Sequence, residues 1–420
     1  MLENFKVDAS EIDKINSFSN EEKVFRLKNL NYFNDAGFPN KKIEDWKFTD
    51  LRNIVSKNFN KLDFESKKKL EPKIDFLKNF DHNYIVVVNG KLSSSSFEFE
   101  QKDKIIVKNF TNENFSEKKE HNPLVCLNHA LSDSGYFLKV EDNYKFKKVL
   151  VIYNLYTSDL DENILNNKNK IQIGKNSELH TLELAINKSK KNFFNNVYEN
   201  IIVEDSAIFK SISIQNEKSH GYFHKYSKNK LSTKSNYSSF IFPSGFKFNK
   251  LDLEFDLEGE HCECNIQAAS FLNQDDHQEI KTKVNHLAPN CKSYQRVKNV
   301  LDSESKGIYQ GKVFVKDVAQ KTDAYQLSKA ILLSDNSEFD SKPELEIYAD
   351  DVKCSHGSTS GNIDEDSIYY LMTRGLSRKE SIKLLVNGFL NEVINSIKSN
   401  SLKNFIHEKL EDQLYEHKKH

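Results

Sequence analysis

Glycine, proline and cysteine are scarce in this chain of 420 residues, which contains 13 Gly, 6 Pro and 5 Cys. Average usage of about 7% would give about 29 glycines, so the fold does not turn its corners mainly with glycine. The cysteines are too few and too scattered for a disulfide scaffold, and they indicate a reducing compartment. They are Cys126, Cys262, Cys264, Cys291 and Cys354.

Signals for membranes and export are missing as well. The sequence contains no run of about 18 apolar residues, which a membrane-spanning helix would need. The first ten residues lack the charged and then apolar layout of a signal peptide. We therefore expect a soluble protein in the cytoplasm, without contact with a membrane.

An excess of charge of either sign is also absent. The 61 Lys and Arg residues balance 62 Asp and Glu residues, which leaves a formal charge of −1. Nucleic acids and anionic membranes attract proteins through a strong positive field, so we expect neither as a partner. The 30 Phe and 17 Tyr supply the apolar surface of a globular protein. The length predicts two to three domains.

Helical patterns occupy both ends of the chain. The first 80 or so residues are polar with helical spacing of their apolar positions. Near the other end, Asp364 is placed to cap a helix that Gly375 would close. The sequence Ser377-Arg-Lys-Glu380 predicts a capping box, and a long amphipathic helix follows it.

Short β-rich runs recur between these helical ends, from about residue 84 to about residue 348. Leu251–Leu257 alternates apolar and acidic residues, which is typical of a strand with one buried face. Almost nothing between the runs has the length of a crossover helix, which argues against a doubly wound α/β sheet. A stretch of about 260 residues is long for a sandwich, which closes near ~100, whereas the stacked coils of a β-solenoid accommodate it. We favour a solenoid, although no fixed-period repeat is visible.

Three segments resemble known catalytic or nucleotide-binding motifs but depart from them. Gly307–Lys312 is one residue short of a phosphate loop, and Val313 replaces the residue that would bind Mg²⁺. Gly357–Gly361 has Thr359 where a nucleophile elbow would carry serine. His261-Cys-Glu263 lacks the downstream cysteine pair of a zinc deaminase. None of these segments supports an enzyme.

Two pairs of side chains remain as candidates for thiol chemistry. Cys262 and Cys264 would share one face of a strand, where they are either small buried residues, which we favour, or ligands of a soft metal. Cys354 and His356 have the same spacing and together suit Zn, Fe or Cu. Two ligands are too few for a closed site, so a second subunit would have to complete it. The alternative is that His356 is a structural histidine at a domain junction.

The segment around this second pair resembles a known family. Lys342–Gly357 reads Lys-Pro-Glu-Leu-Glu-Ile-Tyr-Ala-Asp-Asp-Val-Lys-Cys-Ser-His-Gly and is similar to the signature of the SufD family, which belongs to the Suf iron–sulfur cluster assembly system. Further similar segments are Glu44–Arg52, His286–Asn290, Gly307–Val313, Gln320–Gln326, Leu332–Ser334, Tyr370–Leu376 and Gly388–Phe389. The paralogous SufB family carries a cysteine where this chain has Tyr325-Gln-Leu-Ser328, and it lacks the Lys-Cys-Ser-His-Gly run. The resemblance is therefore to SufD.

The resemblance implies a right-handed parallel β-helix, flanked by N-terminal and C-terminal α-helical regions. The implied division is a helical region at 1–80, a β-helix core at 81–355 and a helical, SufC-binding region at 356–420. The resemblance also implies a complex with a SufB-type paralogue and a SufC-type ABC ATPase. Such a chain is not itself an enzyme, because the nucleotide belongs to the partner.

The site residues follow from the same resemblance. His356, together with Cys354, is expected to hold iron or a nascent cluster at the interface with SufB, and only transiently. The lone chain is expected to bind no cofactor stably. Arg374, Gly375 and Phe389 match family positions in the region that binds SufC. Two alternatives stay open, which are a self-sufficient homodimeric scaffold for Fe–S clusters and a β-solenoid enzyme such as a lyase or acyltransferase.

Overall fold

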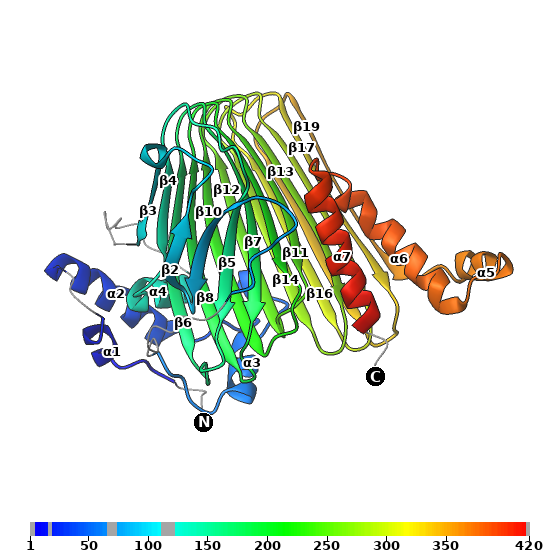
Figure 1. The fold of residues 1–420 in the computed structure, drawn as a ribbon, viewed down its shortest axis with the longest axis horizontal. Coiled ribbons are helices and arrows are strands. Elements are labelled where there is room, and N and C mark those ends of the chain that lie inside the picture. The colour runs from blue at the N-terminus through cyan, green and yellow to red at the C-terminus, as the bar shows by residue number, and fades with distance from the viewer. Residues whose placement is uncertain (1–4, 16–18, 65–73, 111–121, 417–420) are drawn as a thin grey trace.

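The computed structural model describes residues 5–15, 19–64, 74–110 and 122–416. Strands make up 45% of the chain and form a β-solenoid of about eight turns, and helices make up 21% and lie in the N- and C-terminal regions (Figure 1). The predicted solenoid with helical flanks is therefore confirmed. The secondary structure changes type at Asn83 and after Asn362, and the division into domains at residues 80 and 355 stays a prediction.

Each coil contributes one strand to each of two sheets, and strands of successive coils pair in parallel. In spatial order, the ten-stranded sheet consists of β19 (Val352–Asn362), β17 (Thr322–Leu332), β15 (Lys292–Leu301), β13 (Glu263–Leu272), β11 (Asn236–Pro243), β9 (Ile208–Gln215), β7 (Glu178–Asn187), β5 (Leu150–Tyr156), β1 (Asn83–Val88) and β2 (Lys91–Ser96). The nine-stranded sheet consists of β18 (Glu338–Ile347), β16 (Lys306–Val315), β14 (His277–His286), β12 (Phe248–Leu257), β10 (Gly221–Leu231), β8 (Phe193–Val203), β6 (Ile164–Ile173), β4 (Tyr136–Val140) and β3 (Ile105–Asn109).

The two ends of the solenoid differ. At one end, the antiparallel strands β2 and β3 close the two sheets. At the other end, β18 and β19 are the last strands of their sheets in the described part of the chain. Their backbone groups on the outer side therefore have no strand to pair with, which makes this end an open edge.

The coils return to the same corner through residues in the left-handed conformation. The corner residues have φ between 55° and 62°, and they are Asn143, Asn176, Ser206, Lys234, His261, Asn290 and Lys321. The backbone N–H of each corner residue donates a hydrogen bond to a carbonyl of the next coil, as that of Lys234 does to the Glu260 carbonyl at 2.8 Å. These are mostly asparagine, serine and lysine, which confirms that the corners are not made mainly with glycine.

The repeat is real, but its length varies. From β4 onward, partner residues on neighbouring parallel strands are between 26 and 33 positions apart, from the pair Tyr222 and Phe248 to the pair Phe137 and Lys170. The strands themselves keep a constant register, so the variation lies in the corners that join them. This variation explains why no fixed period is visible in the sequence.

The helices lie outside the solenoid in two groups (Figure 1). They are α1 (Ser10–Asp13), α2 (Asn20–Ala36), the 3-10 helix η1 (Glu44–Trp46), α3 (Leu51–Asn58), α4 (Pro123–Leu131), α5 (Glu365–Thr373), α6 (Arg378–Ile394) and α7 (Asn400–Glu416), with a second 3-10 turn η2 (Lys102–Lys104). The first group buries an apolar cluster against the nine-stranded sheet, and α6 and α7 bury a second one against the ten-stranded sheet. A third cluster fills the interior between the sheets.

The predicted caps of the C-terminal helices are present. The Asp364 side chain accepts the N–H of Asp366 at 3.2 Å. Ser377 and Glu380 form the complete capping box, and Gly375 follows α5 with φ of 96°. The turn at Gly375 therefore has the conformation that favours glycine.

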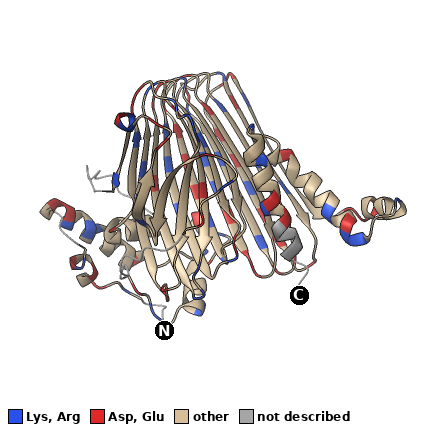
Figure 2. Cartoon of the chain, viewed as in Figure 1, with Lys and Arg blue, Asp and Glu red and all other residues tan. Residues whose placement is uncertain are grey.

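Charges of both signs are spread over the strands and helices (Figure 2), in agreement with the balanced composition. Among the described residues, no helix combines the length and the apolar character that crossing a membrane requires.

Candidate functional site

Cys354 and His356 lie on β19, the last strand of the ten-stranded sheet. In the parallel register with β17, Cys354 pairs with Ala324 and His356 pairs with Gln326. Ala324 and Gln326 are buried inside the solenoid, so the two site residues point to the interior side of the open coil. His356 is nevertheless exposed, because no further coil covers it. The structure therefore brings this pair together at the edge where a partner can reach it.

Cys354 is half-buried against apolar side chains of the last two coils. Its neighbours in that cluster include Val313, Val315 and Ala349. This burial raises the pKa of the Cys354 thiol above its ordinary value. In the lone chain the thiol is therefore protonated at neutral pH, and a metal or a new cation at the edge would be needed to form the thiolate.

Cys354 and His356 alone are too few donors for a closed metal site. No cluster of three or more His, Cys, Asp or Glu side chains suited to a metal ion occurs within the described residues. Cys354 and His356 supply one soft and one borderline donor, a set that suits iron or zinc. Any further ligands would have to come from outside the described chain.

The other cysteine pair is buried in the solenoid wall. Cys262 and Cys264 are 0% and 1% exposed, so the interpretation as small buried residues is confirmed. The Cys262 thiol contacts the carbonyl oxygens of Ser232 and Gly259 at 3.0 Å each. The Cys291 thiol in the next coil contacts the same Gly259 carbonyl at 3.2 Å. These groups have partners inside the protein and no path to solvent.

The three residues expected to bind the ATPase lie on or next to the C-terminal helices. Arg374 and Gly375 are exposed at the end of α5, which projects from the solenoid in Figure 1. Phe389 on α6 is half-buried, and its carbonyl and ring both contact the Lys298 ammonium group, at 2.9 Å and 4.3 Å. Phe389 therefore anchors α6 to β15, whereas Arg374 and Gly375 are free to meet a partner surface.

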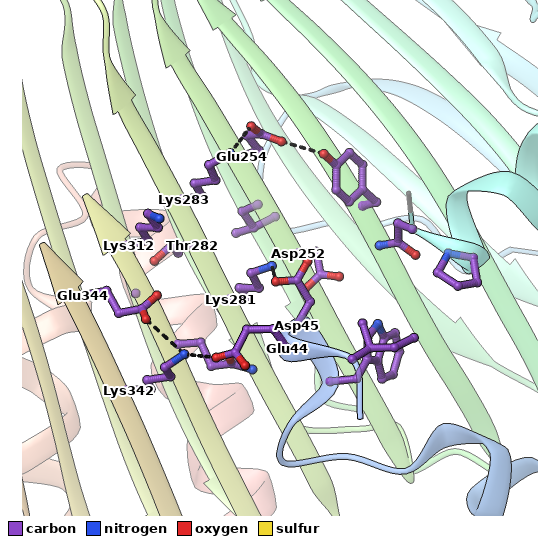
Figure 3. A pocket seen from close by; sticks show the side chains of 18 residues that line it. Glu44, Asp45, Asp252, Glu254, Lys281, Thr282, Lys283, Lys312, Lys342 and Glu344 are labelled. Atoms are coloured by element: carbon purple, nitrogen blue, oxygen red, sulfur yellow. Dashed lines mark hydrogen bonds and ion pairs between the residues drawn. The ribbon is translucent and has the colours of Figure 1, made fainter. Parts of the chain in front are cut away.

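A second feature surrounds the segment Glu44–Trp46, which belongs to the N-terminal motif. This segment forms η1 and covers the outer face of the nine-stranded sheet beside a cavity of about 640 Å³ (Figure 3). The lysines that line the cavity each form an ion pair, and they are Lys281, Lys283, Lys312 and Lys342. The cavity wall is therefore balanced in charge and does not select an anion.

Beneath η1 lies a buried network of charges. Lys250 is 0% exposed, with its ammonium group 4.6 Å from the Trp46 ring and in ion pairs with Glu279 and Asp252. Burial alone would raise the pKa of Asp252, but the charge of Lys250 and a hydrogen bond from His224 hold it well below its usual range. The network fixes η1 to the solenoid, so the N-terminal motif has a structural role here.

The sequence identified Trp46 but not the charged residues under it. Asp252 belongs to the alternating run Leu251–Leu257, whose acidic residues we expected in solvent, yet Asp252 is 4% exposed. The reason is that η1 covers this part of the outer face. Lys250 and Glu279 meet because they are register partners 29 positions apart, a relation that becomes visible only once the coil length is known.

Two family models match the chain. The SufBD core domain of the SUF system for FeS cluster assembly matches residues 155–389, and the SufBD protein N-terminal region matches residues 10–152. The iron–sulfur cluster assembly protein SufD of Escherichia coli is 23% identical over 380 residues, covering 88% of this chain and 87% of that protein. An iron–sulfur cluster assembly SufBD family protein of Synechocystis is 24% identical over 398 residues, covering 87% and 85%. A SufD of Plasmodium falciparum is 25% identical over 252 residues, covering 59% of this chain and 17% of that protein.

The matched regions include the solenoid, the N-terminal motif and α6 up to Phe389. The chain belongs to the SufBD family of iron–sulfur cluster assembly proteins and is similar to SufD within it.

Proposed function

We propose that this chain is the SufD-type subunit of a cytoplasmic Suf scaffold, in which it pairs with a SufB-type paralogue and binds a SufC-type ABC ATPase. In this role it is not a catalyst, and it supports iron acquisition and cluster assembly at the shared interface. The observation that carries the proposal is the open edge of the solenoid, because Cys354 and His356 lie on it.

The open edge has the properties of a docking site for another solenoid. β18 and β19 are 10 and 11 residues long and end their sheets side by side. Unpaired N–H and C=O groups along such edges favour the addition of strands from a partner. A SufB-type solenoid docked here would continue both sheets and bring its own ligands to Cys354 and His356.

The ATPase would bind at α5 and α6. Tyr369 and Tyr370 are 71% and 57% exposed on α5, and Leu384 is 52% exposed on α6. Aromatic side chains exposed together on a projecting helix are typical of protein interfaces. The ATPase would carry the nucleotide. Its dimerisation would move this chain and the SufB-type chain relative to each other.

Co-expression with SufB-type and SufC-type partners, followed by purification through a tag on this chain, tests the pairing. Hydrogen exchange of the β19 amides should slow in the complex, since their outer groups become paired. Unchanged exchange of β19 in a stable complex would place the interface elsewhere.

The site is tested by His356→Ala in the assembled complex, with Ser355→Ala as the matched control on the opposite face of β19. We expect cluster formation from iron(II) and sulfide to fall for the His356 variant alone. Full cluster formation by that variant would refute the site. A lone chain that assembles a cluster as a homodimer under anaerobic conditions would instead support the self-sufficient scaffold, and turnover by the lone chain would support an enzyme.

A further inference from the structure

Gln326 is a buried glutamine with no hydrogen-bond partner for either end of its side-chain amide. It is 0% exposed on the interior face of β17. Among the described residues, it is the only one whose side-chain nitrogen and oxygen are both buried without a partner. Each such group costs about 1–3 kcal/mol, so the amide is held at a substantial cost in folding free energy.

The position of Gln326 is directly beneath His356. The two residues are register partners on β17 and β19, and neighbouring strands lie about 4.8 Å apart. Their side chains therefore project from the same face, one above the other. No further coil stacks on His356, so its ring is the nearest polar group above Gln326 in this column.

The same column holds a second buried glutamine, whose side chain is hydrogen-bonded at its oxygen but not at its nitrogen. Gln295, one coil further in, is the register partner of Gln326. Its amide oxygen accepts hydrogen bonds from the hydroxyls of Thr282, at 2.5 Å, and Tyr309, at 3.2 Å. No such hydroxyl reaches Gln326. The amide nitrogen of Gln295 is itself buried without a partner and can pair with one end of the Gln326 amide, which leaves the other end to face the His356 ring toward the open edge.

An apolar side chain would serve the interior better if packing were the only demand. Ile266 occupies this column two coils below Gln326, and it is fully buried. Leucine or isoleucine at position 326 would remove two unpaired polar groups at similar volume. A glutamine at this place is therefore explained by a role at the site above it.

We propose that Gln326 is a positioning residue of the Cys354–His356 site, whose carboxamide hydrogen-bonds one ring nitrogen of His356 after a rotation of either side chain, because neither amide atom has a partner in the conformation that the structure describes. A neutral imidazole has one donor and one acceptor nitrogen. A bond from Gln326 to one of them selects the tautomer and turns the other nitrogen toward the incoming iron. This inference rests on the proposed function for the identity of the metal, but its geometry concerns this chain alone.

The first test uses the lone chain and does not depend on any partner. Nitrogen-15 shifts of labelled histidine rings report the tautomer of each imidazole at pH 8, and a His356→Asn spectrum identifies the His356 signals. We expect one dominant tautomer in the wild-type chain and a mixture closer to that of free histidine in Gln326→Leu. Equal tautomer populations in both proteins would overturn the proposal.

The second test uses the complex with its SufB-type and SufC-type partners. We expect Gln326→Leu to lower the yield of cluster from iron(II) and sulfide several-fold and to change the nitrogen-14 coupling in pulsed EPR of the reduced cluster. Gln326→Asn, which keeps the amide, should restore part of both. Gln278→Leu is the matched control, since Gln278 is a buried glutamine with an unpaired oxygen in the other sheet.

Stability separates positioning from a purely structural role. Gln326→Leu should leave the unfolding midpoint of the lone chain unchanged or raise it, because it removes unpaired groups. A lowered midpoint, together with loss of the complex, would show that the amide is structural and would overturn the proposal. Failure of the wild-type chain to bind its partners would refute the proposed function, while the tautomer measurement would still decide the role of Gln326.

Discussion

Replacing Lys250 by methionine should loosen the N-terminal segment from the solenoid. Lys250 contacts four groups, which are the Asp45 carbonyl at 3.0 Å, the Glu279 and Asp252 carboxylates and the Trp46 ring. Methionine keeps most of the volume but removes the charge. Glu279, which is also 0% exposed, would then retain its charge without a cation.

The size of the effect follows from this burial. Removing one member of a buried ion pair costs about 3–5 kcal/mol, because the remaining charge is left unpaired. The lost contact with the Trp46 ring adds up to about 2 kcal/mol when it is shielded from water. Glu279 keeps hydrogen bonds from Thr49 and Gln310, each 2.7 Å long, so we expect the lower end of this range, about 3 kcal/mol.

The chain contains a single tryptophan, Trp46, so its fluorescence reports on this junction alone. Urea unfolding followed by fluorescence and by far-UV circular dichroism compares the junction with the solenoid. Lys250→Met should lower the fluorescence midpoint more than the dichroism midpoint, and adding Glu279→Gln should recover part of the loss. Lys228→Met, at a half-buried position on β10, is the control. A Lys250→Met protein within about 0.5 kcal/mol of the wild type, the range of ordinary surface changes, would refute the reasoning.

Three further predictions concern the corners, the interior and the thiols. Lys234→Gly should raise the free energy of unfolding by up to about 1 kcal/mol, since Lys234 has φ of 59°. Lys228→Gly within β10 should lower it. Equal effects of the two variants in urea unfolding would contradict the corner geometry. Burial lowers the pKa of His286 to about 4, so between pH 6.5 and 4 the unfolded chain binds the proton more readily than the folded chain. The free energy of unfolding should therefore fall by about 3 kcal/mol on acidification through that window. His286→Gln should flatten this decline, as measured by calorimetry. Iodoacetamide at pH 7.5 should modify Cys354 alone of the five cysteines. The reaction should be slower than with free cysteine, because the pKa of the Cys354 thiol is raised. Labelling of Cys262, detected by mass spectrometry, would show that the strands around it separate.

The class of fold followed from sequence because strands and helices leave different local patterns. The run Leu251–Leu257 was correctly assigned to a strand, and Ser377 and Glu380 to a capping box, since both depend on neighbours in the sequence. Helix α4 at Pro123–Leu131 was missed. All nine of its residues are buried, so it has no polar face to create an amphipathic pattern, although Asn122 and Pro123 were usable signals for its start.

The site also contains a part that could be predicted from neighbouring residues in the sequence and a part that could not. Cys354 and His356 are close in sequence, so their shared face could be predicted from the spacing alone. Gln326 lies 30 positions earlier, and its relation to His356 depends on the length of one coil. Since that length varies between 26 and 33 residues from β4 onward, register partners cannot be assigned from the sequence by a fixed offset. The structure was needed to place the amide beneath the imidazole.

The open edge also bears on the order in which the protein is made. Each coil of a solenoid is completed on the surface of the coil before it, so ordered structure grows along the chain in steps. Synthesis from the N-terminus would finish β1 and β5 early and β19 late. Cys354 and His356 would thus become correctly placed only when every preceding coil is in register. A partner solenoid that recognises β19 would therefore select chains whose coils are all formed.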